Sequence, residues 1–352
     1  MPPGKESVPR REDGDGIMSE ASYSTNSNFS TTAEHEMAKL EPKLQRLVKE
    51  YQCLPAFERR YDFKAPIVWR NVVKMSVLHG IALLAFYYGP MATWESWFFY
   101  LTVFLCSNFG VTAGAHRYWT HKSYKATLPV QIILMCFYSI SMQNDILEWC
   151  RDHRVHHKFS ETSADPHNAK RGFFFAHIGW LLMKKHPDVL IKGRNIDLSD
   201  LKSDPIVMFQ HRHYLLLSLT FSILLPVFIP WYFWSEDLWI AFVVLFAFRY
   251  VVTLHTTWLV NSAAHLWGSR NYDKHINPAD NRLVCFAALG EGWHNYHHTF
   301  PYDYATSEWG PSINLTTIVI DFLAAVGLVY DRKQVSSQAI DRVRRRIGDL
   351  SQ

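Results

Sequence analysis

Nine of the eighteen histidines in this sequence stand in groups whose spacing could bind metal ions. In chain order the groups are His116 and His121; His153, His156 and His157; His265; and His294, His297 and His298. Neutral imidazole is a common ligand of iron, zinc and copper. Residues at i, i+3 and i+4 share one face of a helix, so the second and fourth groups can each present three rings together.

Nine imidazoles exceed the needs of one ion, because tetrahedral zinc takes four ligands. We therefore expect two ions with four or five nitrogens each, and open positions for oxygen or water, as in non-haem iron oxygenases. His116 and His121 are five residues apart, which would splay their rings on a straight helix. We expect that pair to bracket a helix end.

Acidic side chains near these groups are expected to fix the orientation of the rings. The candidates are Asp152, Glu161, Asp165 and Glu291. Asn261 precedes His265 by one helical turn and could hold a water on one metal. Histidines outside the groups are expected to be hydrogen-bonded residues of the protein interior, and these are His79, His177, His211, His213 and His255.

Four apolar segments are close to the length of about twenty residues that a membrane-spanning helix needs. They cover approximately 72–89, 94–114, 214–234 and 238–260. A fifth apolar run, 128–142, is shorter, which favours a buried or interfacial helix. The mean hydropathy of −0.10 suits a few spans joined to a sizeable water-facing domain.

The order of the histidine groups and the spans limits the topology. The first group follows the second span, the next follows run 128–142, and the last follows the fourth span. A single site needs them all on one side, so run 128–142 cannot cross the membrane. The link 88–95 has no Lys or Arg, the link 235–237 is acidic, and the segments that hold the histidines are basic. The positive-inside rule therefore places the histidines and both termini in the cytosol.

These patterns predict an all-α integral membrane protein in which four transmembrane helices are capped by a cytosolic helical domain. Residues 1–60 are expected to be a disordered to amphipathic segment, 61–335 the functional domain, and 336–352 a charged tail. The five scattered cysteines argue against a disulfide framework and favour a reducing compartment. A net charge of +4 gives no case for nucleic-acid binding.

The histidine pattern and several longer motifs resemble the membrane acyl-CoA desaturases of the stearoyl-CoA Δ9 desaturase family. The matching motifs are GVTAGAHR (110–117), ETSADPHN (161–168), RGFFFAHIGW (171–180), WLVNSAAH (258–265) and GEGWHNYHH (290–298). The resemblance covers about residues 65–335 and is strongest with the animal Δ9 branch, of insect type.

The resemblance implies that two iron ions activate O₂ to remove hydrogens from adjacent methylenes of a saturated fatty acyl-CoA. A cis double bond would result, with Δ9 the favoured position. Electrons would come from NADH through cytochrome b5 reductase and cytochrome b5, at the endoplasmic reticulum membrane. No H-P-G-G haem motif occurs, so cytochrome b5 is expected to be a separate partner. The nine grouped histidines match the family's iron ligands, and Asn261 matches its water-mediated position.

The resemblance also implies substrate positions. Those that hold CoA or the start of the acyl chain match Asn71, Asn144, Arg151, Asp152, Lys184, Lys185 and Trp258. Those that line the acyl tunnel match Phe104, Asn108, Gln143, Trp149 and Thr257, the last three at its bend. The family usually has Tyr and Ala where this chain has Phe104 and Asn108. Asparagine is larger than alanine, so we expect a shorter tunnel that favours acyl chains shorter than stearoyl.

Several other functions are compatible with parts of the pattern. A desaturase of other regiospecificity, such as Δ11, or a membrane fatty-acid hydroxylase could use the same histidines. A metal transporter is disfavoured because its ligands would lie within the spans, near the middle of the bilayer. A non-catalytic binding protein is disfavoured by the intact set of ligands.

Overall fold

The computed structural model describes residues 42, 45–46, 65–309 and 314–349. The chain divides into two units, Met1–Arg46 and Leu47–Gln352, and every element discussed below belongs to the second. Apart from three helical positions, the predicted N-terminal segment 1–60 lies outside the described residues.

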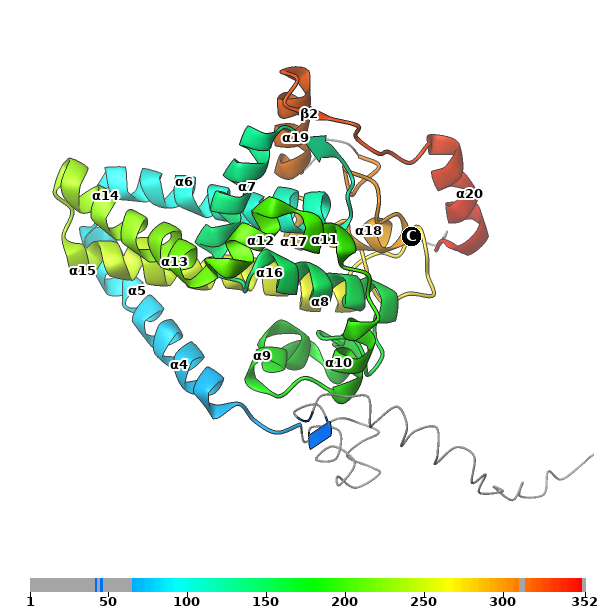
Figure 1. Cartoon of the computed structure of the whole chain (residues 1–352), viewed down its shortest axis with the longest axis horizontal. Coiled ribbons are helices and arrows are strands. Elements are labelled where there is room, and N and C mark those ends of the chain that lie inside the picture. Colours follow the sequence, from blue (N-terminus) through cyan, green and yellow to red (C-terminus); the bar gives the residue numbers. More distant parts are fainter. Residues whose placement is uncertain (1–41, 43–44, 47–64, 310–313, 350–352) are drawn as a thin grey trace, which may run out of the picture. The chain divides into compact units, whose positions relative to one another are not determined.

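Four helices of the described chain are long and apolar enough to cross a membrane: Trp69–Met91, Trp94–Thr120, Tyr214–Trp234 and Leu238–Leu266 (Figure 1). The first comprises α4 (Trp69–Leu83), α5 (Ala85–Tyr88) and η1 (Gly89–Met91), and the second α6 (Trp94–Phe109) and η2 (Gly110–Thr120). The third comprises α13 (Tyr214–Ser218), η5 (Leu219–Leu224) and α14 (Leu225–Trp234), and the fourth α15 (Leu238–Ala241), η6 (Phe242–Phe248) and α16 (Arg249–Leu266). Each of the four predicted spans lies within one of these helices. The second and fourth helices run beyond the predicted limits, because the same helices continue to carry His116 and His265.

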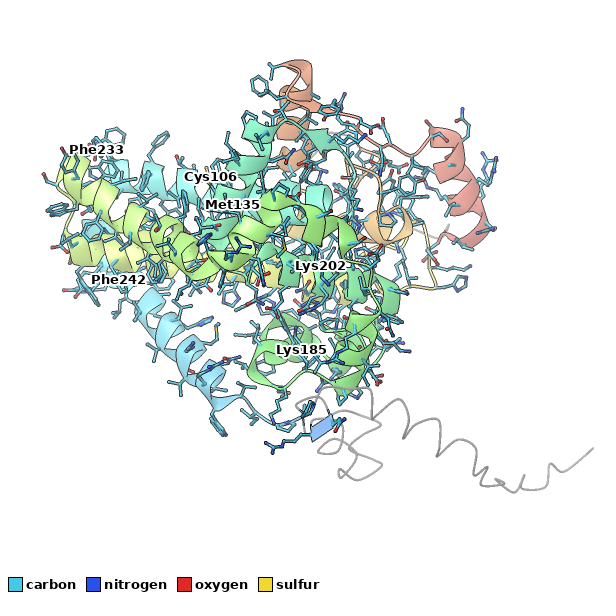
Figure 2. All side chains as sticks on the ribbon, viewed as in Figure 1. Cys106, Met135, Lys185, Lys202, Phe233 and Phe242 are labelled. Atoms are coloured by element: carbon cyan, nitrogen blue, oxygen red, sulfur yellow. The ribbon has the colours of Figure 1, made fainter. Side chains whose placement is uncertain are left out.

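Large apolar side chains point outward along these helices, as expected where lipid replaces water. Trp94 is 75% exposed and Phe98 is 68% exposed. Figure 2 shows Phe233 and Phe242 at one end of the long helices, and Lys185 and Lys202 away from that end. The separation of aromatic from charged side chains agrees with a membrane-embedded part and a water-facing part.

Polar contacts join the spans at the ends that lie away from the grouped histidines. The Thr93 hydroxyl accepts a hydrogen bond from the amide of Ser96 and so caps α6. Buried Glu236, in the other link, accepts from the amide of Thr93 at 2.9 Å and from its hydroxyl at 3.0 Å. The two links that join spans one to two and three to four are thereby tied together.

Run 128–142 forms α7 (Leu128–Ser141), which is followed by α8 (Ile146–Phe159) at an angle of 82°. Met142 and Asn144, in the turn between them, have positive φ values of 47° and 67°. His116 before this pair and His153 within it lie in the same histidine cluster. The pair therefore returns to the side from which it started, in agreement with the prediction that this run does not cross.

Shorter elements complete the water-facing part. Between α8 and the third span lie η3 (Ala169–Arg171), η4 (Phe175–Gly179), α9 (Trp180–Leu182), α10 (Pro187–Arg194), α11 (Ser199–Ser203) and α12 (Pro205–Arg212). After the fourth span lie α17 (Arg282–Ala287), α18 (His294–Thr299), α19 (Leu315–Ala325) and α20 (Ser337–Ile347). The strands β1 (Lys125–Ala126) and β2 (Val329–Tyr330) pair antiparallel and form the only sheet in the described residues. The all-α prediction is confirmed.

The two largest hydrophobic cores hold most of these elements together. One lies among the spans, with Ala241, Val244 and Ala247 fully buried. The other packs η2, α7, α8, α12 and α19 around residues such as Tyr138 and Ile146. The second core fixes the helices that carry the first two histidine groups. The domain limits 61–335 and 336–352 stay predictions.

Candidate metal centre

The structure gathers all nine grouped histidines into two neighbouring clusters. The five-histidine cluster consists of His116, His121, His153, His157 and His297. The four-histidine cluster consists of His156, His265, His294 and His298. Within each cluster, one ring nitrogen per residue lies within 4.8 Å of all the others. The division into five and four nitrogens is the one expected for two ions.

Each H-x-x-H-H motif contributes to both clusters. Helix α8 gives His153 and His157 to the five-histidine cluster and His156 to the other. Helix α18 gives His297 to the five-histidine cluster, and its two remaining histidines to the other. Because α8 and α18 each supply histidines to both clusters, the two clusters are held next to each other.

The five-residue spacing of His116 and His121 is resolved by a wide helical turn. Residues 110–120 form a π-helix, in which hydrogen bonds join residues five apart. The amide of His121 donates to the carbonyl oxygen of His116 at 3.1 Å. The pair does bracket a helix end, as expected, since His121 is the residue that follows η2. The wide turn, which the sequence analysis did not foresee, brings the rings 4.9 Å apart.

The distances between ring nitrogens fit ligands that share an ion. In the five-histidine cluster, Nε2 of His297 lies 2.9 Å from Nε2 of His116 and 3.0 Å from Nε2 of His157. In the four-histidine cluster, Nε2 of His294 lies 2.9 Å from Nε2 of His265. Neighbouring ligands of an octahedral ion with metal–nitrogen bonds of about 2.1 Å are about 3.0 Å apart.

In both clusters, carboxylates contact the Nδ1 atoms of histidine rings. Nδ1 of His116 lies 2.9 Å from Glu291, Nδ1 of His156 lies 2.8 Å from Asp165, and Nδ1 of His265 lies 2.7 Å from Glu161. A carboxylate on Nδ1 keeps the proton there and leaves Nε2 with a lone pair for a metal. The prediction for these three acids is confirmed. It is wrong for Asp152, because its carboxylate is taken up by ion pairs with Arg151 and Lys185 instead of a histidine ring.

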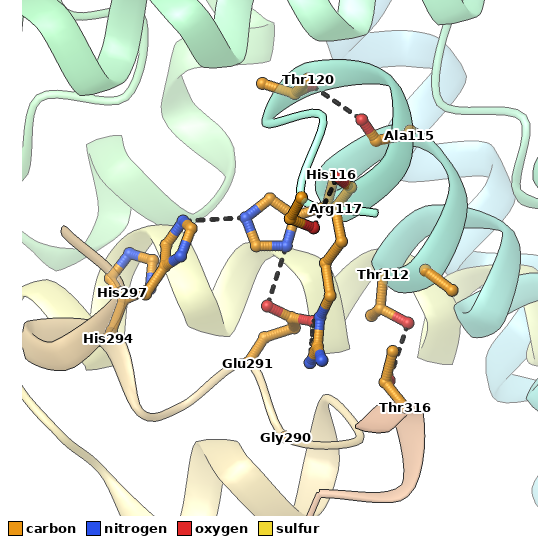
Figure 3. A network of polar contacts seen from close by, with 12 residues as sticks. Thr112, Ala115, His116, Arg117, Thr120, Gly290, Glu291, His294, His297 and Thr316 are labelled. Atoms are coloured by element: carbon orange, nitrogen blue, oxygen red, sulfur yellow. Dashed lines mark hydrogen bonds and ion pairs between the residues drawn. The ribbon is translucent and has the colours of Figure 1, made fainter. Parts of the chain in front are cut away.

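A buried arginine that sequence reasoning missed holds Glu291 (Figure 3). Arg117 donates to Oε1 of Glu291 from Nε at 3.0 Å and from Nη2 at 2.8 Å. The same guanidinium donates to Thr317 and to Asn314. Burial by itself raises the pKa of Glu291, but Arg117 and His116 outweigh it and lower that pKa to about 2. Glu291 is therefore an anion that can orient the His116 ring.

The rings themselves are suited to bind cations. Burial, and then the neighbouring imidazoles, lower the pKa values of His297 and His298 well below the usual value. Neutral rings keep the lone pairs that metal ions need. Nε2 of His121 and Nε2 of His156 are buried without a hydrogen-bond partner in the described structure. Since buried polar atoms are rarely left unpaired, these two nitrogens point to a bound ion.

Two cavities border the clusters. The small cavity, of about 50 Å³, is lined by His116 and His153 of one cluster and His294 of the other. The large cavity has a volume of about 380 Å³. Both cavities are lined by Trp149, His153, Thr257 and Asn261. A long ligand that passes from one cavity to the other would therefore lie beside both clusters.

Comparison with known proteins identifies the family. Residues 92–306 match the sequence profile of the fatty acid desaturases, which is more than half of the chain. The chain belongs to the fatty acid desaturase family. It is 56% identical over 286 residues to an acyl-CoA desaturase of Cyprinus carpio, covering 81% of this chain and 88% of that protein.

Two further members of the family are similarly close. The chain is 52% identical over 307 residues to an acyl-CoA Delta-9 desaturase of Acheta domesticus, covering 86% of this chain and 85% of that protein. It is 52% identical over 286 residues to the stearoyl-CoA desaturase of Homo sapiens, covering 81% of this chain and 80% of that protein. The resemblance noted in the sequence is confirmed.

Within this desaturase fold, four of the predicted substrate positions line the large cavity, namely Asn71, Asn144, Asp152 and Trp258. Two further predicted substrate positions, Arg151 and Lys185, bind the carboxylate of Asp152. Arg151 donates to Oδ1 of Asp152 at 2.9 Å, and the Lys185 ammonium contacts the other oxygen. Lys184 precedes Lys185 and is not among the residues that line the described cavities.

The predicted tunnel residues divide between the cavities. Asn108, Trp149 and Thr257 line the small one, and Gln143 lines the large one together with the last two. Phe104 lines neither of these cavities of the described chain and stacks on Tyr100 at 6.3 Å between ring centroids. Of the two residues predicted at the closed end of the tunnel, only Asn108 therefore lines one of these cavities.

Three histidines outside the clusters form a string of hydrogen bonds that ends at a serine: His79, His255, His177 and Ser262. Adjacent ring nitrogens are 3.2 and 2.8 Å apart. These rings are paired with one another, as expected of hydrogen-bonded interior residues. The same expectation is wrong for His211, which is exposed and lies 3.1 Å from Asp145, because it is at the surface end of α12.

Proposed function

We propose that this chain is a di-iron acyl-CoA desaturase that introduces a cis double bond at Δ9 into saturated fatty acyl-CoA. The observation that carries the proposal is the position of both histidine clusters beside two cavities that share four lining residues. The similar proteins of Cyprinus carpio, Acheta domesticus and Homo sapiens are all named as desaturases, which favours desaturation over hydroxylation.

The five-histidine and four-histidine clusters would each hold one iron ion. Nitrogen ligands suit iron, and positions left open on non-haem iron can accept oxygen. When bound, the irons would supply the O₂-dependent oxidation that removes hydrogens from the acyl chain. The four-histidine cluster has one nitrogen fewer, and Asn261 lines the small cavity beside His294 of that cluster. Asn261 is therefore the residue to hold a water as a further ligand.

The remaining predicted residues would bind and orient the acyl-CoA. The large cavity has the polar groups for the thioester and CoA side, with Asp152 held in place by Arg151 and Lys185. Burial works against ionisation of Asp152, but Lys185 and Arg151 prevail and lower its pKa, so the carboxylate is available to accept hydrogen bonds. Trp149 and Thr257, shared by both cavities, would bend the acyl chain beside the clusters. A fixed bend selects the carbons that react.

The location and the electron supply belong to the same proposal. Four membrane-crossing helices with the nine grouped histidines at one side suit an enzyme of the endoplasmic reticulum whose site and termini face the cytosol. NADH-cytochrome b5 reductase and cytochrome b5 would deliver the electrons from that side.

The test is expression in a yeast that lacks its own desaturase, followed by mass spectrometry of derivatised fatty acids. The wild-type chain should yield monounsaturated products with the double bond at carbon 9. His297→Ala should abolish them and lower the iron content, whereas His275→Ala, at an exposed histidine outside the clusters, should change neither. If yeast that express the wild-type chain contain no unsaturated fatty acids, the proposed activity is refuted. Full activity of His297→Ala would refute the metal assignment.

A further inference from the structure

Arg249 is a fully buried arginine inside the fourth membrane-crossing helix, Leu238–Leu266. In the described structure it has no carboxylate within ion-pair distance, and all its acceptors are uncharged. Nε donates to the carbonyl oxygen of Leu245 at 3.0 Å. Nη2 donates to the hydroxyl of Ser222 at 2.9 Å and to the carbonyl of the same residue at 3.2 Å.

A charged group at this depth needs a reason, because burial of an ion without a counter-ion is costly and charged residues in spans are usually functional. A fourth acceptor atom, in α7, gives such a reason. Nη1 points to the carbonyl oxygen of Ile140 at 3.5 Å, within the last turn of α7. The carbonyl groups at a helix C-terminus carry partial negative charge, which favours a cation there.

Arg249 and the next residue together secure the turn between α7 and α8. The hydroxyl of Tyr250 donates to the carbonyl oxygen of Met142 at 3.2 Å, and Tyr138 donates to that of Gln143 at 2.9 Å. Met142 is in the left-handed region, so the turn is strained and depends on such contacts.

The same turn forms part of the cavity wall. Met142, Gln143 and Asn144 all line the large cavity. The Gln143 amide donates to the hydroxyl of Thr257 at 2.9 Å, and Thr257 lines both cavities. A shift of the turn would therefore move the wall at the bend, without touching any histidine of the clusters.

We propose that Arg249 is a positioning residue that sets the bend of the acyl cavity, and through it the position of the double bond. The inference rests on the proposed desaturase function, since it concerns the product of that reaction. Arg249 contacts neither cluster and lines neither cavity in the described chain, so it acts through the turn at 142–144.

The test measures double-bond positions in the same yeast, for Arg249→Lys, Arg249→Met and the milder Ser222→Ala. Arg249→Met should raise the fraction of products with shifted double bonds by roughly tenfold, as expected for the loss of a hydrogen bond to a charged group. Arg249→Lys keeps the charge but not the fork of donors, so it should give an intermediate shift. Ser222→Ala removes one acceptor and should give the smallest shift in the same direction.

The matched control is Arg212→Met, at an exposed arginine near the end of α12. It should leave the product pattern unchanged. A variant that is only less stable makes less product with the double bond in its usual place. If Arg249→Lys and Ser222→Ala both give the wild-type pattern, the positioning role is refuted even where Arg249→Met does not fold. If the wild type makes no unsaturated product, the proposed function itself fails, which is a different result.

Discussion

At the scale of single residues, His116 is fixed from two sides. Its Nδ1 meets Glu291 and its Nε2 meets His297, and Arg117 holds the carboxylate in place. Because imidazole binds a metal through one nitrogen only, the partner of the other nitrogen decides which lone pair is offered. Glu291 and Arg117 are therefore expected to affect metal binding through the orientation of the His116 ring.

Glu291→Gln should weaken iron binding about 10- to 100-fold, with a parallel loss of desaturation. Glutamine keeps the size of the side chain but removes the charge that both His116 and Arg117 require. Iron per protein, measured by elemental analysis during titration with a chelator, checks the effect. Glu308→Gln is the control, since Glu308 binds Tyr272 and Arg344 outside the clusters. Equal iron retention in both variants would contradict the role of Glu291.

Asn108→Ala should shift the preference from palmitoyl towards stearoyl chains. Asn108 is buried in the wall of the small cavity, where its amide donates to the carbonyl of Phe104 and its oxygen accepts from Thr256. Removal of the amide lengthens the cavity. The ratio of C16 to C18 products should fall severalfold, whereas Cys106→Ala on the same helix should leave it unchanged. If Asn108→Ala leaves the ratio of C16 to C18 products unaltered, the chain-length hypothesis is contradicted.

At the scale of elements, the wide turn of η2 and its crossing with α7 place the first histidine group. Gly110 is where the two helices touch, because a Cβ atom there would lie 2.1 Å from the amide nitrogen of Tyr138. No side chain fits at that distance. The glycine therefore lets the second span pack directly against the backbone of α7.

Gly110→Ala should destabilise the protein by about 3 kcal/mol or more, since it overpacks a backbone contact that cannot yield. Gly80→Ala is the matched control, because a Cβ at Gly80 meets nothing within 4 Å and alanine favours helix. Thermal unfolding in detergent, followed by fluorescence-detected size exclusion, compares the two. Equal melting temperatures would contradict the close crossing of η2 and α7 at Gly110.

At the scale of the whole Leu47–Gln352 unit, four crossings and one returning pair of helices place the four histidine groups on one side. An additional crossing by α7 and α8 would put His116 and His153 on opposite sides, yet their ring centroids lie 4.8 Å apart. The bend of 82° between these helices is therefore essential to the site.

Single-cysteine labelling in sealed microsomes checks this topology. A membrane-impermeant maleimide should label Thr162→Cys, in the exposed loop after α8, and should label Ala92→Cys only after detergent is added. The first position lies on the side of the histidines, and the second lies in the link between the first two spans. Equal labelling of both in sealed vesicles would contradict the arrangement.

The sequence alone determined which histidines gather, how many spans there are and that run 128–142 does not cross. These properties follow from local rules: ligand spacing, the thickness of a bilayer and the parity of crossings. The family followed from the same residues, because the histidine motifs and their flanking stretches are specific.

Only the tertiary structure decided which histidines share a cluster, and that Arg117 and Arg249 are buried between elements. His156 joins His265 rather than His153 three residues away, because the rotation of α8 against α16 and α18 sets its direction. The contacts of Arg117 and Arg249 link residues over a hundred positions apart, such as Arg117 with Glu291 and Arg249 with Ile140. Helix rotation and packing at such separations leave no periodic trace in the chain, so spacing could not reveal them.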